Sequence, residues 1–403
     1  MRQSVISSID LSKDLSDESI CDVIDDKILS YSSDSYLPLK ERVSLRRRIM
    51  NSLRGFDVLQ ELLDDPSVTE IMVNGFENIF VERNGQIIKT DLVFSSVEQL
   101  SNIVQQIVAY SNRRVNESNP IVDARLKDGS RVNIVLNPVA INGPIITIRK
   151  FSGSPMSIER LIELNSVTRE AADFLKKLVV SGYNIFVSGG TSSGKTTFLN
   201  VLSDFIPKRE RVITIEDSAE LNLHGIDNLV RLEMRQANVE GFGEISIRDL
   251  IHSALRMRPD RLVIGEVRGA EAIDMLQAMN TGHDGCMSTG HANSAADMLN
   301  RLVTMSLTAM DIPLNAIKGQ IASAIDIIIH LGRMNDRSRR VLEITEIDHF
   351  NGQDIILNPL FSFSTENGLT PTGIPNLQSK QFQYLCKLLS KDFHLYPQNQ
   401  QLY

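Results

Sequence analysis

The sequence contains few cysteines and no long apolar run. Its 403 residues include three cysteines, Cys21, Cys286 and Cys386, which lie far apart and form no CxxC pair. This spacing excludes a disulfide framework and a zinc ribbon, and it favours a reducing environment. No window approaches the roughly 18 consecutive apolar residues of a membrane span, and the first residues lack the apolar segment of a signal peptide. We therefore expect a cytoplasmic protein with no transmembrane segment, which meets a membrane only through its surface or its partners.

A basic surplus is also missing. The chain carries 42 basic and 50 acidic residues, which gives a net charge of −8. Proteins that bind nucleic acid without sequence preference usually present a basic surface, so we expect no stable nucleic-acid binding. The hydrophobic fraction of 42% is ordinary for a globular protein. A chain of this length can bury a sizeable core in two or three domains.

The N-terminal region changes sign along its length. Residues 1–40 are rich in Ser and Asp, which predicts a poorly packed or mobile extension. In residues 41–54, arginines alternate with Leu45, Ile49 and Leu53, and this spacing predicts an amphipathic helix. A solvated basic face is the simpler interpretation, and a docking surface for a membrane-side or acidic partner is the alternative. We assign residues 1–54 to an acidic, partly mobile N-terminal extension that ends in a basic helix.

Residues 55–153 have a mixed pattern that predicts a small α+β domain. A helical pattern covers residues 97–110, and Asn84-Gly85 is a hairpin turn signal because type I′ turns need positive φ. The strand-like runs are residues 71–73, 79–82, 87–88, 132–136 and 145–148.

Residues 154–360 alternate between strand-like and helical patterns. This alternation indicates an α/β fold with a parallel sheet. The expected strands are residues 184–188, 212–216, 229–232, 261–265, 286–289 and 325–330, followed by 341–347 and 354–357. We assign residues 361–403 to a peripheral C-terminal tail.

One motif carries most of the chemistry. Residues 189–196 read GGTSSGKT and match G-x-x-x-x-G-K-[ST], between an apolar run and a helical pattern. The backbone N–H groups of such a loop and the following helix N-terminus bind phosphate. Lys195 would contact the β- and γ-phosphates of ATP, and the Thr196 hydroxyl would ligate Mg²⁺. The predicted nucleotide-binding residues are Gly189, Gly190, Thr191, Ser192, Ser193, Gly194, Lys195, Thr196 and Thr197.

Carboxylates follow two of the predicted strands. Glu266 comes after the strand at residues 261–265 and is suited to orient water or act as general base. An Asp that serves Mg²⁺ usually ends this strand, but Gly265 stands there. Glu216 and Asp217 end the strand at residues 212–216, and Asp217 is a second candidate Mg²⁺ ligand. Ligands of parallel sheets bind outside the carboxyl ends of strands, so these carboxylates are placed to contact a ligand. The alternative is that each carboxylate caps the next helix.

Two histidines flank a short predicted strand at residues 286–289. His291 follows this strand, which favours a contact with the γ-phosphate, whereas the role of His283 stays open. His283 and Cys286 together could suggest a metal site, but no second Cys/His pair accompanies them.

Arginines are needed because inserted guanidinium groups stabilise the transition state of phosphoryl transfer. Arg131 and Arg149, in the small domain, are the preferred candidates. Arg256, Arg258 and Arg268 flank the strand before Glu266 and are weaker candidates. For each of them, a surface ion pair is the simpler alternative.

The order of these segments resembles the secretion ATPase superfamily. After the phosphate loop come residues 215–217, 255–261, 265–269 and 281–293, which look like the Asp box, the atypical Walker B segment and the His box. Residues 123–126, 129–133, 232–238 and 278–285 are similar to the CpaF/TadA type, the tight-adherence (Tad/Flp) pilus assembly ATPases. The resemblance covers about residues 55–350, and it implies a RecA-like P-loop NTPase core after a small α+β domain.

By this resemblance the chain is a homohexameric, Mg²⁺-dependent ATPase. It would work on the cytoplasmic face of the inner membrane, where it would drive pilus assembly with platform proteins. The resemblance makes Glu266 the water activator, His291 the γ-phosphate sensor, and Arg131 and Arg149 the N-domain phosphate contacts, with Glu216 as a further catalytic carboxylate. Residues 151–155 would be the hinge between the domains. A type IV secretion ATPase that moves protein or DNA, and a nucleotide-gated scaffold with little turnover, are the alternatives.

Overall fold

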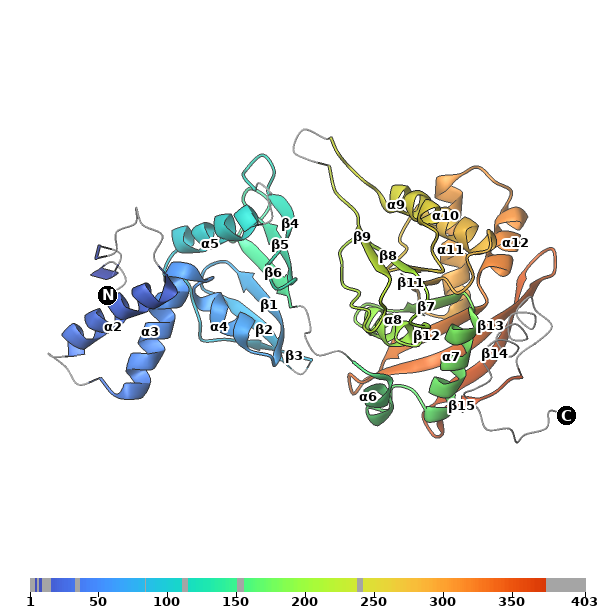
Figure 1. The fold of residues 1–403 in the computed structure, drawn as a ribbon, viewed down its shortest axis with the longest axis horizontal. Helices are drawn as coiled ribbons and strands as arrows, with labels where there is room; N and C mark the ends of the chain where they lie inside the picture. The colour runs from blue at the N-terminus through green and yellow to red at the C-terminus, as the bar shows by residue number, and fades with distance from the viewer. Residues whose placement is uncertain are drawn as a thin grey trace. The chain divides into compact units, whose positions relative to one another are not determined.

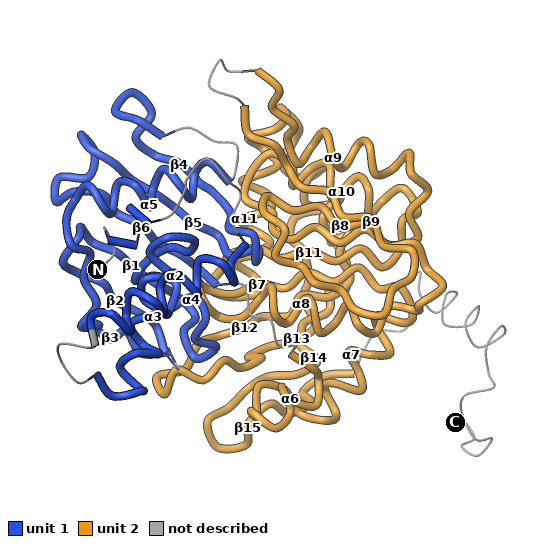
Figure 2. The backbone as a smooth tube through the Cα atoms, turned by 60° about the vertical axis from the view of Figure 1, so that its left-hand side comes forward, with its two compact units in different colours: residues 1–153 blue, residues 154–403 orange. Residues whose placement is uncertain are grey.

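The protein is described from a computed structural model. The model describes residues 4–5, 7–8, 16–32, 37–83, 85–110, 115–150, 156–237 and 242–374. The chain divides into two compact units, residues 1–153 and 154–403 (Figure 2). The expected hinge at residues 151–155, Asn84 of the expected hairpin turn and residues 375–403 lie outside the described residues. Among the described residues, no helix combines the length and the apolar character that crossing a bilayer requires.

Two paired helices precede the first sheet. They are α2 (Asp17–Ser32) and α3 (Leu39–Arg54). Isoleucines of α2 pack with Ile49 of α3 in a small core of their own. Arg46 lies 3.4 Å from Asp25, and Arg54 lies 3.6 Å from Asp17. The basic helix is found as predicted, but much of the acidic segment before it is also a packed helix, because its charge and its apolar face complement those of α3.

The first unit contains a six-stranded antiparallel sheet in the order β3-β2-β1-β6-β5-β4 (Figure 1). Alternate residues of β5 and β6 are buried with the apolar face of α5, as the period of two in a strand requires. The prediction of a small α+β unit is confirmed, and β4 and α4 are additions to it. The elements are α4 (Val58–Asp64), β1 (Val68–Asn74), β2 (Ile79–Arg83), β3 (Gln86–Lys89), α5 (Val97–Tyr110), β4 (Ile121–Arg125), β5 (Arg131–Val135) and β6 (Ile145–Arg149).

The second unit is built on a nine-stranded sheet in the order β15-β14-β13-β12-β7-β11-β10-β8-β9. The strands from β12 to β9 are parallel, and β13, β14 and β15 add an antiparallel extension. The strands are β7 (Ile185–Gly189), β8 (Val212–Glu216), β9 (Leu229–Glu233), β10 (Arg261–Ile264), β11 (Met287–His291), β12 (Ile327–Arg333), β13 (Arg339–Phe350), β14 (Ile355–Ser364) and β15 (Gly368–Pro371). The predicted α/β fold with a parallel-rich sheet is confirmed.

Helices cover both faces of this sheet (Figure 1). Alternate side chains of β7 enter different cores: Ile185 and Val187 pack with α7 and α8, whereas Phe186 packs with α10 and α11. The strands are therefore apolar on both faces, as is usual for buried parallel strands. The helices are α6 (Ile158–Glu163), α7 (Arg169–Ser181), α8 (Lys195–Ser203), α9 (Ile247–Ala254), α10 (Glu271–Asn280), α11 (Ala295–Ala309) and α12 (Leu314–Ala324).

The sheet extends further along the chain than the sequence predicted. The expected boundary of the domain at residue 360 falls inside β14, and β15 pairs with the end of β14. The residues after 360 resemble a tail in sequence because they are rich in Gln, Asn and Ser, with scattered aromatics. Antiparallel pairing at the sheet edge nevertheless includes residues up to Pro371.

Candidate active site

The phosphate-binding motif forms the predicted strand–loop–helix. It connects the buried strand β7 to α8, whose first residue is Lys195. Gly194 has φ of 92° and Ser192 has φ of 58°, so the loop turns twice through the left-handed region. Gly189 has no room for a side chain, since a Cβ there would lie 2.5 Å from the carbonyl oxygen of Leu331. The loop therefore has the tight backbone that phosphate binding requires.

Lys195 is held over this loop by backbone carbonyls. Its Nζ donates to the carbonyl oxygens of Gly189 and Gly190 at 3.2 and 2.9 Å, and the residue is 7% exposed. The same Nζ lies 3.3 Å from Nδ1 of His291. A buried ammonium that neutral carbonyls hold in place is an attractive site for an anion.

A continuous chain of polar contacts runs from Lys195 across the carboxyl ends of four strands. His291 ends β11, and its Nε2 lies 2.9 Å from Oε1 of Glu266, which follows β10. Arg268 donates from Nη2 to Oε2 of Glu266 at 2.6 Å, and its Nη1 lies 3.3 Å from Asp217 after β8. The structure thus brings together Lys195, His291, Glu266 and Asp217, as the sequence predicted, and adds Arg268 as the link between the two carboxylates.

Electrostatics favours a neutral His291. Burial lowers the pKa of His291, and the positive charge of Lys195 lowers it further, while Glu266 opposes this effect. Since Lys195 approaches Nδ1 and Glu266 approaches Nε2, we assign the proton to Nε2 from these partners. The hydrogen bond to Glu266 raises the pKa of Arg268, which therefore stays charged.

Glu216 is the most buried carboxylate of the site. It is 2% exposed, and its Oε2 accepts from the backbone N–H groups of Glu220 and Leu221, both at 2.7 Å. Its Oε1 has no hydrogen-bond partner among the described residues. Burial raises the pKa of Glu216 to about 7.

The position of Glu216 explains the glycine at residue 265. A Cβ on Gly265 would lie 3.0 Å from Cγ of Glu216, so no larger side chain fits without a shift. The space beside the end of β10 is therefore filled by Glu216 from the neighbouring strand β8. The sequence showed the glycine but not its cause.

The residues present fit a Mg²⁺ ion bound together with a nucleotide. Mg²⁺ in such sites takes one or two protein oxygens and completes its shell with phosphates and water. The Thr196 hydroxyl in the first turn of α8 and the unpartnered Oε1 of Glu216 would supply those oxygens. Asp217, the other candidate ligand, is engaged with Arg268. Within the described part of the chain, no cluster of His, Cys, Asp and Glu could hold a metal by itself.

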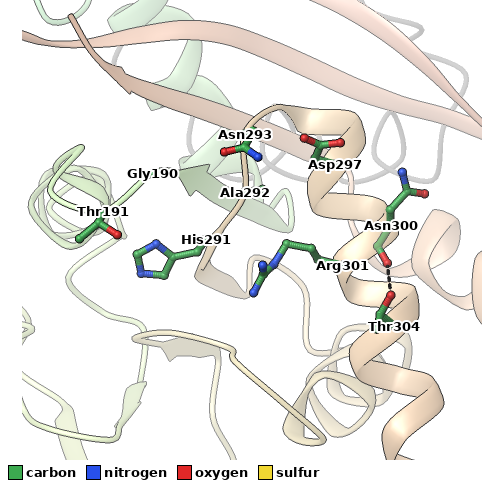
Figure 3. Close-up of a pocket in the computed structure, with 9 residues that line it drawn as sticks. All are labelled: Gly190, Thr191, His291, Ala292, Asn293, Asp297, Asn300, Arg301 and Thr304. Atoms are coloured by element: carbon green, nitrogen blue, oxygen red, sulfur yellow. Dashed lines mark hydrogen bonds between the residues drawn. The ribbon is translucent and has the colours of Figure 1, made fainter.

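A cavity of about 550 Å³ opens beside the loop (Figure 3). Gly190, Thr191 and His291 line one side of it, and Asn300 and Arg301 of α11 line the other. In Figure 3 the guanidinium of Arg301 extends toward His291, and its charge is one cause of the lowered pKa of that ring. The sequence analysis did not include Arg301. It could have been a candidate, because it lies in the helix that directly follows His291.

Other candidates are not brought to this site. His283 lies in the turn before β11, at the opposite end of that strand from His291, and its ring contacts Thr281. Burial raises the pKa of the Cys286 thiol to about 12, which makes it a poor metal ligand. Arg256 and Arg258 precede β10, whereas Glu266 follows it, so they belong to the other edge of the sheet.

Arg131 and Arg149 are direct neighbours in the first unit. They oppose each other on β5 and β6, and Arg125 of β4 opposes Arg131 on the other side. Glu70 of β1 opposes Arg149. Like charges that face each other on adjacent strands are unfavourable unless opposite charges lie near them, and Glu70 supplies one such charge beside Arg149.

Comparison with known proteins identifies relatives of most of the chain. The family model described as "Type II/IV secretion system protein" matches residues 52–362. A putative conjugal transfer protein of Mycobacterium tuberculosis is 32% identical over 314 residues, which is 76% of this chain and 88% of that protein. The type IV secretion system protein PtlH of Bordetella pertussis is 32% identical over 312 residues, 71% of this chain and 92% of that protein.

Solved structures share the fold. The crystal structure of the pilus retraction motor PilT with bound ADP has a TM-score of 0.54 at 20% identity and covers 83% of this chain and 89% of that one. The ATPase DotB of Legionella pneumophila has a TM-score of 0.51 at 22% identity, with 72% and 80% covered. At these identities the similarity shows the fold alone, and the predicted RecA-like core is confirmed.

Proposed function

Because the chain belongs to the type II/IV secretion system protein family, we propose that it is a Mg²⁺-dependent ATPase that works as a homohexameric motor on membrane-bound machinery. The observation that carries the proposal is the polar chain from Lys195 through His291 to Glu266, beside a preformed phosphate loop. A phosphate loop alone would only bind nucleotide. The polar contacts from Lys195 to Glu266 supply the further groups that hydrolysis needs.

Each group has a role in the proposed reaction. The backbone of residues 189–197 binds the phosphates, and Lys195 turns from the loop carbonyls to the β- and γ-phosphates. Glu266 accepts the proton of the attacking water while the bond between the γ-phosphorus and the bridging oxygen breaks. His291 donates to the γ-phosphate from Nε2, the nitrogen that faces Glu266 when no nucleotide is bound. A bound Mg²⁺ would neutralise charge on the β- and γ-phosphate oxygens.

Glu266 is restrained before the reaction. Arg268 donates to Oε2, and the ring of His291 lies against Oε1, which is buried, so water reaches Oε1 only when the ring moves. We propose that the γ-phosphate draws His291 toward itself and thereby frees Oε1. Arg131 and Arg149 are the proposed contacts of the first unit with the same phosphate, and residues 151–155 are the proposed hinge.

A substitution of Glu266 tests the proposed chemistry. Glu266→Gln keeps the shape of the side chain but removes the base, so ATP turnover falls by about 10²–10⁴-fold while ATP binding persists. Lys195→Ala loses binding as well. Glu233→Gln, which changes the carboxylate at the end of β9, is the matched control and keeps its turnover. Normal turnover by the Glu266 variant would contradict the assignment.

The proposed cargo is a pilus of the Tad/Flp type, which rests on the resemblance of residues 123–133 and 278–285. The motor would sit on the cytoplasmic face of the inner membrane and act on platform proteins. A type IV secretion ATPase that moves protein or DNA is the second candidate, because relatives carry names of conjugal transfer and type IV secretion proteins. Replacement of the gene by the Glu266→Gln allele distinguishes the two cargoes, since loss of surface pili and loss of protein or DNA transfer are separate readouts.

A scaffold with little turnover is excluded if single-turnover hydrolysis keeps pace with ATP binding.

A further inference from the structure

The phosphate loop contains one residue in an unfavourable backbone conformation. Ser192 has φ of 58°, in the left-handed region that glycine adopts freely and other L-residues adopt at a cost. Serine has a Cβ and none of the special tolerance of Asn or Asp. Some other contact must therefore hold this residue, or the loop would relax when no phosphate is bound.

Arg339 makes that contact from a distant part of the chain. Its Nε donates to the carbonyl oxygen of Ser192 at 3.0 Å, although the two residues are 147 apart in sequence. Its Cδ would lie 3.3 Å from a Cβ on Gly194, so the arginine side chain also runs along the second left-handed residue of the loop. Arg339 is thus hydrogen-bonded to the loop at Ser192 and lies beside it at Gly194.

The hairpin between β12 and β13 fixes the position of Arg339. The backbone N–H of Met334 donates to the carbonyl of Ser338 at 2.8 Å, and Arg337 has φ of 68° in this turn. Asp336 accepts hydrogen bonds from both the backbone and the hydroxyl of Ser338. Since β12 pairs with β7 over the whole length of β7, the hairpin and the phosphate loop belong to one rigid framework.

We propose that Arg339 is a positioning residue that holds Ser192 in the left-handed conformation, so that the phosphate loop is preformed before nucleotide arrives. The inference rests on the proposed function, because it concerns the same nucleotide site. Arg339 acts through the backbone of Ser192 and makes no contact with the nucleotide itself. It follows that a glycine at position 192 makes Arg339 dispensable.

A double-substitution experiment tests this mechanism. The affinity of the full-length chain for a fluorescent ADP analogue is measured with Mg²⁺ for the wild type, Arg339→Ala, Ser192→Gly and the double variant. Arg339→Ala binds about three- to tenfold more weakly, on the scale of one left-handed non-glycine residue. In the Ser192→Gly background, the same substitution weakens binding less than about twofold. Arg340→Ala removes the neighbouring arginine, which contacts Ser338 and Phe363 instead, and it leaves binding unchanged.

Two results would overturn the proposal. Equal losses in the wild-type and Ser192→Gly backgrounds would mean that Arg339 acts on the nucleotide directly, and an unchanged affinity of Arg339→Ala would mean that it does nothing for the loop. Hydrogen exchange at the amides of residues 191–195 without nucleotide is the second readout. Arg339→Ala accelerates it only when residue 192 is serine. A wild-type chain that binds no ADP would refute the proposed function, whereas hydrogen exchange would still decide on Arg339.

Discussion

Single residues of the site are set by their neighbours on other strands. Gly265 is small because Glu216 occupies the adjacent space, and His291 is kept neutral because Lys195 and its burial oppose a second proton. Neither effect is a property of the residue alone. Both effects can be tested by substitution, either of a charged neighbour of His291 or of Gly265 itself.

Removal of Arg301 should raise the pKa of His291. The guanidinium lines the same cavity and disfavours a charged ring by electrostatic repulsion, so Arg301→Ala removes part of the cause of the lowered pKa. NMR titration of histidines labelled with ¹⁵N measures the change. Arg333→Ala, at the end of β12, serves as the control of equal charge, and an unchanged or lowered pKa in the Arg301 variant would contradict the electrostatic account.

Substitution of Gly265 should disturb the site through Glu216. In Gly265→Ala the new Cβ meets Cγ of Glu216 at 3.0 Å, and overpacking of this kind costs about 1–3 kcal/mol. Thermal unfolding should show a lower midpoint, with ATP turnover reduced as well. Gly319→Ala is the control, because its Cβ would meet Phe350 at an ordinary 3.7 Å inside α12, where alanine is the better helix former. Equal midpoints for the two variants would refute the clash.

At the scale of elements, a buried ion pair joins the start of β10 to the turn before β8. Arg261 is 1% exposed, and its Nε donates to Oε2 of Glu210 at 2.5 Å. A buried guanidinium is costly without its partner. The strand that leads to Glu266 therefore depends on a contact at its opposite end.

Loss of Glu210 should destabilise the second unit. Glu210→Ala leaves the guanidinium of Arg261 buried without its carboxylate, which costs about 3 kcal/mol. Calorimetry of the full chain should show the thermal transition several degrees lower. Combination with Arg261→Met should restore most of the loss, because it removes the unpaired charge. A double variant no more stable than Glu210→Ala would argue against this explanation.

The elements show what the sequence could predict and what it could not. The strand β7 and the residues at the ends of β10 and β11 were predictable, because the hydrophobic pattern, the phosphate-loop motif and the strand ends are all local features of the sequence. The contacts of Arg268 with Asp217 and of Arg339 with Ser192 could not be predicted, because strand order brings these partners together from distant parts of the sequence. The helix α2 was taken for a poorly packed extension, because its apolar face is recognised only when α3 is placed against it.

At the scale of the whole molecule, the chain holds two units with separate cores. The two cores of the first unit and the two cores of the second share no residue. The predicted phosphate contacts Arg131 and Arg149 belong to the first unit, and the phosphate loop belongs to the second. The proposed motor would need at least one group in the first unit that responds to the γ-phosphate.

Arg149 should therefore matter for hydrolysis more than for ADP binding. In the proposed mechanism Arg149 contacts only the γ-phosphate, so Arg149→Ala lowers turnover by about a hundredfold or more, as for other inserted arginines. Affinity for ADP changes less than about threefold. Steady-state kinetics and ADP titration measure the two effects, and Arg48→Ala on the helix α3, outside this sheet, is the matched control. Parallel losses of turnover and ADP affinity would contradict the role.

Assembly can be followed by mass. A hexamer would have six times the subunit mass of 45.1 kDa. Sedimentation with and without a slowly hydrolysed ATP analogue should detect this species, whereas a chain that remains a monomer in both conditions would contradict the proposed motor.

The strand that carries the phosphate loop is hydrogen-bonded on both sides, to β11 and to β12. Its backbone can open only when the middle of the sheet comes apart, whereas the margins β9 and β15 each have a neighbour on one side. The amide protons of residues 185–189 should thus be among the last in this unit to exchange with heavy water. Partial denaturation should unfold the edge strands β9 and β15 first. The phosphate loop should stay folded until the whole unit unfolds.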